Sequence, residues 1–251
     1  MCGIIGYVGN REACPLLVGG LKRMEYRGYD SAGIAVVTDG ALKLEKHLGK
    51  VEELAAAVDK LQLTATIGIG HTRWATHGRP SIANAHPHVA GRVAIVHNGI
   101  IENFAQLKAG LEAQGAKFRS ETDSEVLAHL IDRAFTGKRS LAEAVRLSLQ
   151  QVEGTFGLAV ISPAEPQTLV AARRGSPLLV GIGEGELYVA SDATAIVGQT
   201  NQVVYLEDDE VVVCNPSGYE VFDLARRPHT PPVTTIAVEL GEIEKSGYDH
   251  F

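Results

Sequence analysis

The sequence predicts an α+β fold in which two sheets carry flanking helices. Three observations lead to this prediction: the chain opens with a strand, helix, strand pattern; helical periodicity is concentrated between residues 100 and 152; and the second half consists of short β-rich runs at close intervals. The 251 residues suffice for one large domain or two small ones, with a core that needs no disulfide or metal to hold it.

The first predicted strand is Gly3–Val8, an apolar run rich in β-branched residues that begins almost at the chain start. A strand placed this early fixes the second residue on the folded scaffold rather than on a tail. Apolar residues then recur at helical spacing from Leu16 to Met24. A glycine-containing stretch at 28–33 separates this helix from a strand at 34–37.

The remaining elements follow from the same two periodicities. Strands are predicted at 42–48, 65–70, 92–97, 155–161, 168–172, 177–182, 186–190, 202–206, 210–214 and 218–222. Helices are predicted at 51–61, 103–114, 123–135 and 140–151. The helix at 123–135 has a start signal, because Thr122 and Asp123 precede Glu125 and an apolar face.

Composition indicates a soluble, cytoplasmic protein. No apolar run is long enough to cross a bilayer, and the N-terminus lacks the features of a secretory signal peptide. Three cysteines cannot pair evenly, which favours a reducing compartment. The net charge is −7 and the basic residues are scattered singly, so neither nucleic acid nor a membrane is expected as a partner.

Cys2 is the leading candidate nucleophile. If Met1 is removed, Cys2 holds both a thiol and an α-amine, and an amine pKa of about 7.7–8.0 suits it to accept the proton of a thiol with a pKa of about 8.5. While Met1 is attached, that nitrogen belongs to a peptide bond and cannot be the base. On position alone, a small buried residue leading a strand is the better interpretation, and the motifs further along the chain reverse it.

The loop at 71–88 concentrates polar and aromatic side chains after an apolar strand. It contains the single tryptophan, Trp74, and Arg73, whose guanidinium can bind a carboxylate through two parallel hydrogen bonds. We interpret it as a substrate loop around Arg73.

The histidines of this loop allow a second interpretation. His86 and His88, with His71 or His77, could ligate a transition metal, because His-x-His on a strand places both rings on one face. No cysteine or carboxylate stands nearby in sequence to complete the ligand set, so the substrate loop is favoured. We expect His86 and His88 to form hydrogen bonds within the loop.

Two further motifs have both a structural and a catalytic interpretation. Asn98-Gly99, flanked by apolar strands, is a strong hairpin signal, and the Asn98 amide with the Gly99 N–H could also form an oxyanion hole. Asp123 opens a helix and could also bind an ammonium group opposite Arg73. The turn at 25–33 has a structural interpretation, although Arg27 could lie near the active site.

Taken in order, the segments Cys-Gly-Ile-Ile-Gly, EYRGYDSAG, HTRWATHG, NAHPH, HNGIIEN and SETDSEV resemble the glutaminase domain of the glucosamine-6-phosphate synthases, which are class II glutamine amidotransferases. The similarity runs through the whole chain. It implies an N-terminal-nucleophile hydrolase fold, a four-layer α/β/β/α sandwich with two antiparallel sheets.

The resemblance also implies a role for each candidate residue. Cys2 corresponds to the nucleophile, and Asn98 and Gly99 to the oxyanion donors. The glutamine clamp corresponds to Arg73 and Asp123. Thr76 and His77 match residues beside the clamp, and Arg27 matches an arginine near the nucleophile. Trp74 matches the aromatic residue of the loop that closes over glutamine.

The reaction implied is hydrolysis of L-glutamine to glutamate and ammonia by acyl transfer to Cys2, with no metal and no cofactor. The glutaminase domain is predicted over residues 1–225, with a linker or tail over 226–251. Family members continue into two sugar-isomerase domains, so the natural chain is expected to continue and to meet fructose 6-phosphate only there. A homodimer is one assembly that the resemblance allows for the complete enzyme. A histidine-dependent metal hydrolase and a non-catalytic amino-acid sensor remain as alternatives.

Overall fold

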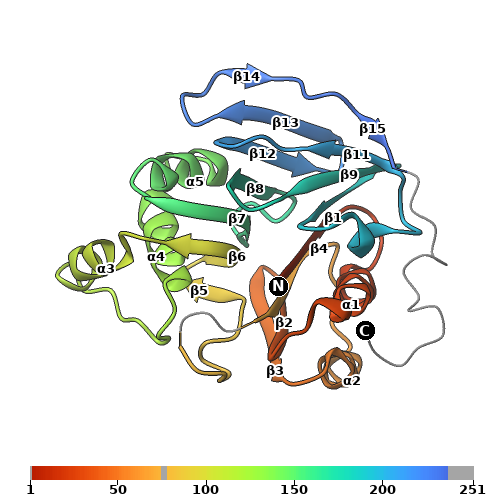
Figure 1. Ribbon diagram of the computed structural model, residues 1–251, viewed down its shortest axis with the longest axis horizontal. Helices are drawn as coiled ribbons and strands as arrows, with labels where there is room; N and C mark the ends of the chain where they lie inside the picture. The colour runs from red at the N-terminus through yellow and green to blue at the C-terminus, as the bar shows by residue number, and fades with distance from the viewer. Residues whose placement is uncertain (1, 75–77, 237–251) are drawn as a thin grey trace.

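Two antiparallel sheets form the centre of the molecule, which the computed structural model describes over residues 2–74 and 78–236 (Figure 1). The first sheet has the strand order β15 (Thr234–Thr235), β11 (Gln202–Tyr205), β9 (Leu179–Gly183), β10 (Glu186–Ala190), β1 (Gly3–Val8), β4 (Ile67–Arg73), β2 (Ser31–Thr38) and β3 (Ala41–Leu48). The second has the order β14 (Pro228–His229), β13 (Gly218–Asp223), β12 (Glu210–Asn215), β8 (Leu169–Arg174), β7 (Gly154–Ile161), β6 (Val93–Ile101) and β5 (His88–Ala90). The predicted α+β fold with two sheets is confirmed.

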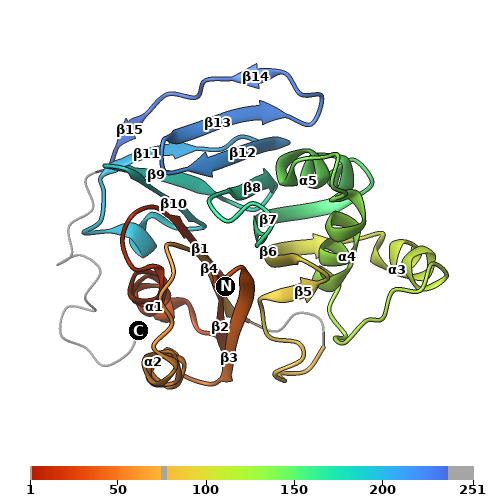
Figure 2. The ribbon, with the colours of Figure 1, turned by 180° about the vertical axis from the view of Figure 1, so that it is seen from behind.

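Helices cover the outer face of each sheet. On the first sheet, α1 (Ala13–Arg23) and α2 (Val51–Leu61) bury their apolar sides, and on the second, α4 (Ser124–Ala134) and α5 (Leu141–Leu149) do the same. Figures 1 and 2 show these two helical layers on opposite sides of the sheets, with α3 (Phe104–Glu112) beside α4. Two short 3₁₀ turns are η1 (Glu25–Arg27) and η2 (Ala193–Ile196). The layers therefore follow the order helix, sheet, sheet, helix.

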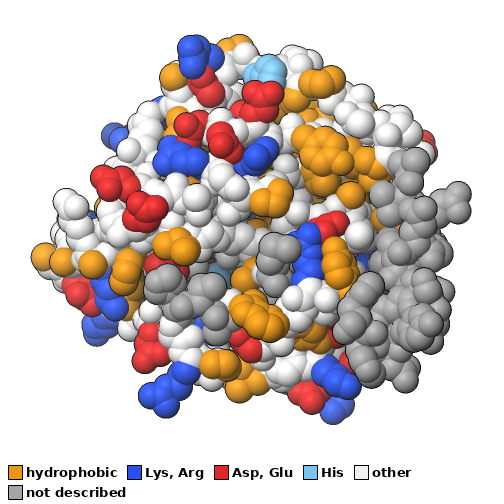
Figure 3. All heavy atoms as spheres, viewed as in Figure 1, with side chains coloured by type: hydrophobic (Ala, Val, Ile, Leu, Met, Phe, Trp, Pro, Cys, Tyr) orange, Lys and Arg blue, Asp and Glu red, His pale blue; other side chains and the backbone are white. Residues whose placement is uncertain are grey.

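The charged side chains on the surface are distributed as the sequence predicts, without a large patch of one sign on the face shown in Figure 3. On this face, acidic and basic side chains are interspersed rather than gathered by sign. None of the helices within residues 2–74 and 78–236 has the length and apolar character needed to span a bilayer.

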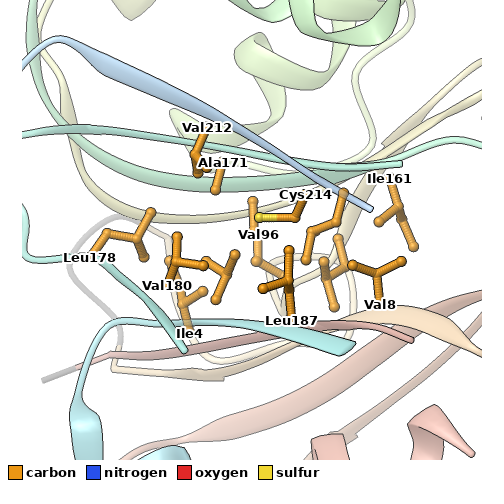
Figure 4. Close-up of a cluster of buried hydrophobic side chains, with 14 of the residues drawn as sticks. Ile4, Val8, Val96, Ile161, Ala171, Leu178, Val180, Leu187, Val212 and Cys214 are labelled. Atoms are coloured by element: carbon orange, nitrogen blue, oxygen red, sulfur yellow. The ribbon is translucent and has the colours of Figure 1, made fainter. Parts of the chain in front are cut away.

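Strict alternation along each strand builds two kinds of core. In β1, Ile4 and Val8 face the second sheet, whereas Ile5 and Tyr7 face α1. In β6, Ala94 and Val96 join the layer between the sheets, whereas Val93 and Ile95 pack against the helices. Figure 4 shows the layer between the sheets, where the labelled side chains, Cys214 among them, come from both sheets and meet in the middle. Strands buried on both faces explain why their sequences read as continuous apolar runs.

Two strands extend further than the sequence predicts, and both extensions matter for the site. The predicted strands end at residues 70 and 97, but β4 continues to Arg73 and β6 to Ile101. Polar residues interrupt the apolar pattern there, while backbone pairing continues, as the register of Ser31 with Arg73 and of Gly99 with Phe156 shows. The predicted ends are too early because the prediction follows the apolar pattern, which stops before the backbone pairing does.

The hairpin prediction at Asn98-Gly99 is wrong. Both residues lie within β6 and pair with β7, so the dipeptide forms no turn. Gly99 has a φ of 137°, and a Cβ built on it would lie 2.1 Å from the Thr155 carbonyl oxygen. Glycine is required here by backbone shape and by the close approach of the neighbouring strand.

Candidate functional site

A cavity of about 460 Å³ opens at the edge of the layer between the two sheets. Seven predicted site residues line it: Cys2, Arg27, Arg73, Trp74, Asn98, Gly99 and Asp123. The other two, Thr76 and His77, lie outside the described residues. The volume falls within the usual range of small-molecule sites.

The same alternation that builds the inner core brings these side chains together. Cys2 shares the face of Ile4 in the first sheet. His71 and Arg73 continue the face of Ile67 and Ile69, and Asn98 continues that of Val96 in the second sheet. Each strand thus presents apolar residues to the core and then polar residues to the cavity. The register of Gly3 with Thr72 places the start of β1 beside the end of β4.

The Cys2 thiol lies in a half-buried position next to the Trp74 backbone. The Trp74 N–H donates to Cys2 Sγ at 3.2 Å. Burial raises the pKa of the thiol and Asp30 adds to that rise, whereas the Trp74 N–H and the Arg73 guanidinium oppose it. The thiol is therefore protonated near neutral pH and needs a base.

Asn98 connects the two sheets at the nucleophile. Its Nδ2 donates to the Cys2 carbonyl oxygen at 3.3 Å, and its Oδ1 is 2.9 Å from His71 Nε2. The side chain is thus bonded on both sides and lies at the cavity wall. Next to it, the Ile100 N–H donates to Thr155 Oγ1 at 3.2 Å.

The Arg73 side chain is only 4% exposed and is held from two directions. Its Nη2 donates to the Gly78 carbonyl oxygen at 2.9 Å, and its Nη1 lies 3.7 Å from Asp30 Oδ1. Asp30 also receives a hydrogen bond from Ser31 Oγ at 2.8 Å. A guanidinium fixed in this way presents a positive charge with little conformational freedom to lose on binding an anion.

Asp123 supplies the opposite charge at the start of α4. It occupies the N-cap position, but its side chain does not cap the helix, because Oδ2 accepts the Ile101 N–H at 2.7 Å. Glu125 does not complete the predicted capping box, because its carboxylate accepts the N–H groups of Arg119 and Ser120, which precede the helix. The contact with β6 thus holds the Asp123 carboxylate beside the cavity.

Arg27 and Trp74 lie at the mouth of the cavity. Arg27 forms an ion pair with Asp192, and its Nε lies 3.2 Å from the Tyr26 hydroxyl. Trp74 is 53% exposed, and its ring lies against Gly28, where a Cβ would be 2.4 Å from Trp74 Cζ3. Gly28 therefore leaves room for the indole.

His86 and His88 are buried, and in the described part of the loop they do not form the hydrogen bonds that the sequence predicts. His88 Nε2 lies 3.0 Å from Thr122 Oγ1, outside the loop, and His86 has no hydrogen-bond partner among the described residues. The expectation of bonds within the loop is therefore wrong for both. Burial lowers the pKa of His88 to about 3 and that of His86 well below its ordinary value, so both rings are neutral.

The metal interpretation gains no support from this geometry. Within the described part of the chain, no group of three or more His, Cys, Asp or Glu is arranged to hold a metal ion. His71 and His88 direct ring nitrogens to Asn98 and Thr122.

Sequence reasoning missed several residues of the site. Asp30 lies in a quoted motif, but its ion pair with Arg73 follows from the pairing of β2 with β4, which periodicity does not give. Ser176 and Ser191 line the cavity from the distant second half of the chain, with no local signal. The bond from His71 to Asn98 had a usable signal, because alternation in β4 places His71 on the face of Arg73.

Comparisons with known proteins identify the family of the chain. Residues 71–198 match the model of a family described as "Glutamine amidotransferase domain". The whole chain is similar to glutamine–fructose-6-phosphate aminotransferase (isomerizing) from Chlorobaculum tepidum, with 52% identity, and from Bacteroides thetaiotaomicron, with 50% identity. The chain covers 42% of each of these relatives, less than half of their length.

Solved structures place the fold among those of amidotransferases. The glutamine phosphoribosylpyrophosphate amidotransferase of B. subtilis, in complex with ADP and GMP, superposes with a TM-score of 0.77 and 29% identity over 90% of this chain and 50% of that one. A glutamine aminotransferase class-II domain protein from Silicibacter pomeroyi gives a TM-score of 0.61 at 17% identity over 89% of this chain and 99% of that one, and it shows the shared fold. The predicted N-terminal-nucleophile hydrolase fold is confirmed.

Proposed function

This chain belongs to the glutamine amidotransferase domain family, and from that premise we propose that it hydrolyses L-glutamine to glutamate and ammonia with Cys2 as nucleophile. The observation that carries the proposal is the single cavity that gathers Cys2 with the Asn98 amide, the Arg73 guanidinium and the Asp123 carboxylate. These groups match the thiol, oxyanion and zwitterion requirements of glutamine cleavage.

The reaction begins at the thiol. After removal of Met1, the free α-amine of Cys2 accepts the thiol proton, and Sγ attacks the side-chain amide carbon of glutamine. The amide oxygen becomes an oxyanion, for which Asn98 Nδ2 and the Gly99 N–H are the proposed donors. The C–N bond then breaks, and the amine returns its proton to the departing ammonia. Water hydrolyses the thioester and releases glutamate.

We assign substrate selection to two charged side chains of the cavity, the Arg73 guanidinium and the Asp123 carboxylate. Arg73 binds the α-carboxylate and Asp123 the α-ammonium group, with Thr76 and His77 as further contacts that the resemblance suggests. Arg27 lies near the nucleophile, and the exposed Trp74 is a candidate to close over bound glutamine. A site built for both charges rejects analogues that lack one of them, because a buried partner would then be left unpaired.

A direct product assay tests the proposal. Protein that begins at Cys2 is expected to convert L-glutamine into equal amounts of glutamate and ammonia, whereas protein that retains Met1 is expected to be inactive because its base is missing. Mass measurement reports the N-terminus of each sample. Binding of glutamine without release of glutamate would favour the amino-acid sensor instead.

The activity of the longer protein is also a proposal. The relatives' name pairs glutamine with fructose 6-phosphate, and we propose that the released ammonia aminates this sugar phosphate in domains that follow a linker or tail at 226–251. The boundary at residue 225 stays a prediction, and β14 and β15, which lie after it, still pair with β13 and β11. We propose a reducing cytoplasm as its compartment, since a nucleophilic thiol must remain reduced.

The clamp predicts a change in KM. Asp123→Asn is expected to raise the KM for glutamine on the order of 10- to 100-fold, because the α-ammonium group then meets a neutral amide instead of a carboxylate. The amide of the variant can still accept the Ile101 N–H through its oxygen, so the fold should persist. Steady-state kinetics with Asp223→Asn on remote β13 as control provide the measurement. An unchanged KM would remove Asp123 from the clamp.

A further inference from the structure

Four histidines are buried around the proposed site, and two of them, His86 and His97, line the cavity. His71, His86, His88 and His97 are between 0% and 5% exposed. The ring centroids of His71 and His86 are 4.1 Å apart, and those of His86 and His88 are 4.5 Å apart. Among these four, His71 is the one with a hydrogen bond to Asn98 within the described part of the chain. The proposed reaction gives His71 no role.

The direction of each hydrogen bond around Asn98 follows from chemistry. The Cys2 carbonyl oxygen can only accept, so the NH₂ end of the Asn98 amide must face it. The oxygen end then faces His71, and His71 Nε2, at 2.9 Å, must be the donor. Burial lowers the pKa of His71 to about 3, so the ring is neutral and its single N–H is the one on Nε2.

We propose that His71 is a positioning residue, whose Nε2–H holds the Asn98 amide with its N–H groups toward Cys2, where the oxyanion forms. This inference rests on the proposed function, since it takes Asn98 as an oxyanion donor. The oxygen and nitrogen ends of an amide are nearly equal in size, so only hydrogen-bond partners decide which end faces the nucleophile.

Loss of this donor has a defined consequence for the amide. The oxygen of Asn98 points to a side where His71 is 0% exposed, so without the Nε2–H it becomes an unsatisfied acceptor. A rotation about the last side-chain bond relieves this cost by turning the oxygen toward the cavity, at the expense of the long hydrogen bond to the Cys2 carbonyl oxygen. An acceptor would then stand where the developing negative charge needs a donor.

Two substitutions separate the donor from the bulk of the side chain. His71→Leu removes the N–H and fills the space with an apolar group. His71→Gln keeps an N–H donor at a similar reach, because the Gln amide nitrogen can occupy the place of the imidazole Nε2. We expect kcat to fall about tenfold or more in the Leu variant, and to stay within a few-fold of the unsubstituted protein in the Gln variant.

A reactive glutamine analogue tests positioning more directly than turnover. In glutamate γ-semialdehyde an aldehyde replaces the amide; Sγ adds to its carbon, the C=O π bond opens, and the oxygen takes the negative charge or the thiol proton. We expect its affinity to fall by the same factor as kcat in His71→Leu. The Kd of L-glutamate, which reports on the clamp, should not change.

A double-mutant comparison completes the test. In an Asn98→Ala background, His71→Leu should have no further effect on kcat, because the amide that it positions is gone. If the Leu variant does not fold, His71→Asn replaces it, since the shorter amide reaches only the Nδ1 position. The thermal unfolding midpoint and circular dichroism of every variant report on folding.

The outcomes distinguish positioning from packing. Equal kcat and equal semialdehyde affinity in the Leu and Gln variants would overturn the positioning role and leave the proposed function intact. Loss of glutamate affinity in parallel with kcat would also overturn it, since general damage to the cavity would then be the cause. Absence of glutamate release from the unsubstituted protein that begins at Cys2 would overturn both proposals.

Discussion

Replacement of Cys2 by Ala is expected to lower glutamine hydrolysis by roughly 10⁴-fold or more, as expected when a covalent nucleophile is removed. Cys2 lines the cavity and lies beside the Trp74 N–H. Initial rates of glutamate release at saturating glutamine provide the measurement, with the Kd of L-glutamate as a check that the clamp still binds. The loss should appear in kcat and leave this Kd within a few-fold.

The other two cysteines provide matched controls. Cys14 in α1 and Cys214 in β12 are buried, and burial raises their thiol pKa values to about 11 and about 12. Cys14→Ala and Cys214→Ala should therefore keep near-normal kcat, and iodoacetamide should label Cys2 in the folded protein well before either of them. Comparable loss of activity in all three variants would defeat the assignment of Cys2.

The fold could be predicted well from sequence because most strands carry an unbroken apolar signal. β1, buried on both faces, was predicted to the residue, whereas β4 and β6 were cut short where polar residues begin. Those polar ends pair with neighbouring strands only in the folded sheet. The prediction therefore fails where the strand residues change from apolar side chains in the core to polar side chains that line the cavity.

The site was less predictable because most of its geometry is non-local. Residue types identify the thiol, guanidinium and carboxylate in the sequence. Arg73 and Asn98 lie beyond the predicted ends of their strands, so their place on the inner faces is seen only in the structure. The pairing of β2 with β4, which brings Asp30 to Arg73, depends on sheet order. The Asn98-Gly99 signal was misleading for a physical reason: glycine is required there by the nearby Thr155 carbonyl and not by a turn.

The second large effect is expected at Asn98. Asn98→Ala should lower kcat by roughly 10²–10³-fold, because one oxyanion donor is lost while glutamine still binds between Arg73 and Asp123. Asn98→Asp should lose at least as much, since a carboxylate oxygen replaces the donor and faces the developing charge. The KM for glutamine should change little in the Ala variant, and the affinity for glutamate γ-semialdehyde should fall with kcat.

Asn103 provides a matched control for the structural role of such an amide. It also bridges two segments, with Nδ2 donating to the Gln151 carbonyl oxygen at 2.9 Å and Oδ1 accepting the Glu153 N–H at 3.1 Å. Asn103→Ala should lower the thermal unfolding midpoint and leave kcat unchanged. If Asn98 only connects β6 to β1, its Ala variant should behave in the same way, with a lower unfolding midpoint and near-normal kcat for the folded protein. That result would remove Asn98 from the oxyanion hole, because a donor to the transition state cannot be lost without a cost to kcat.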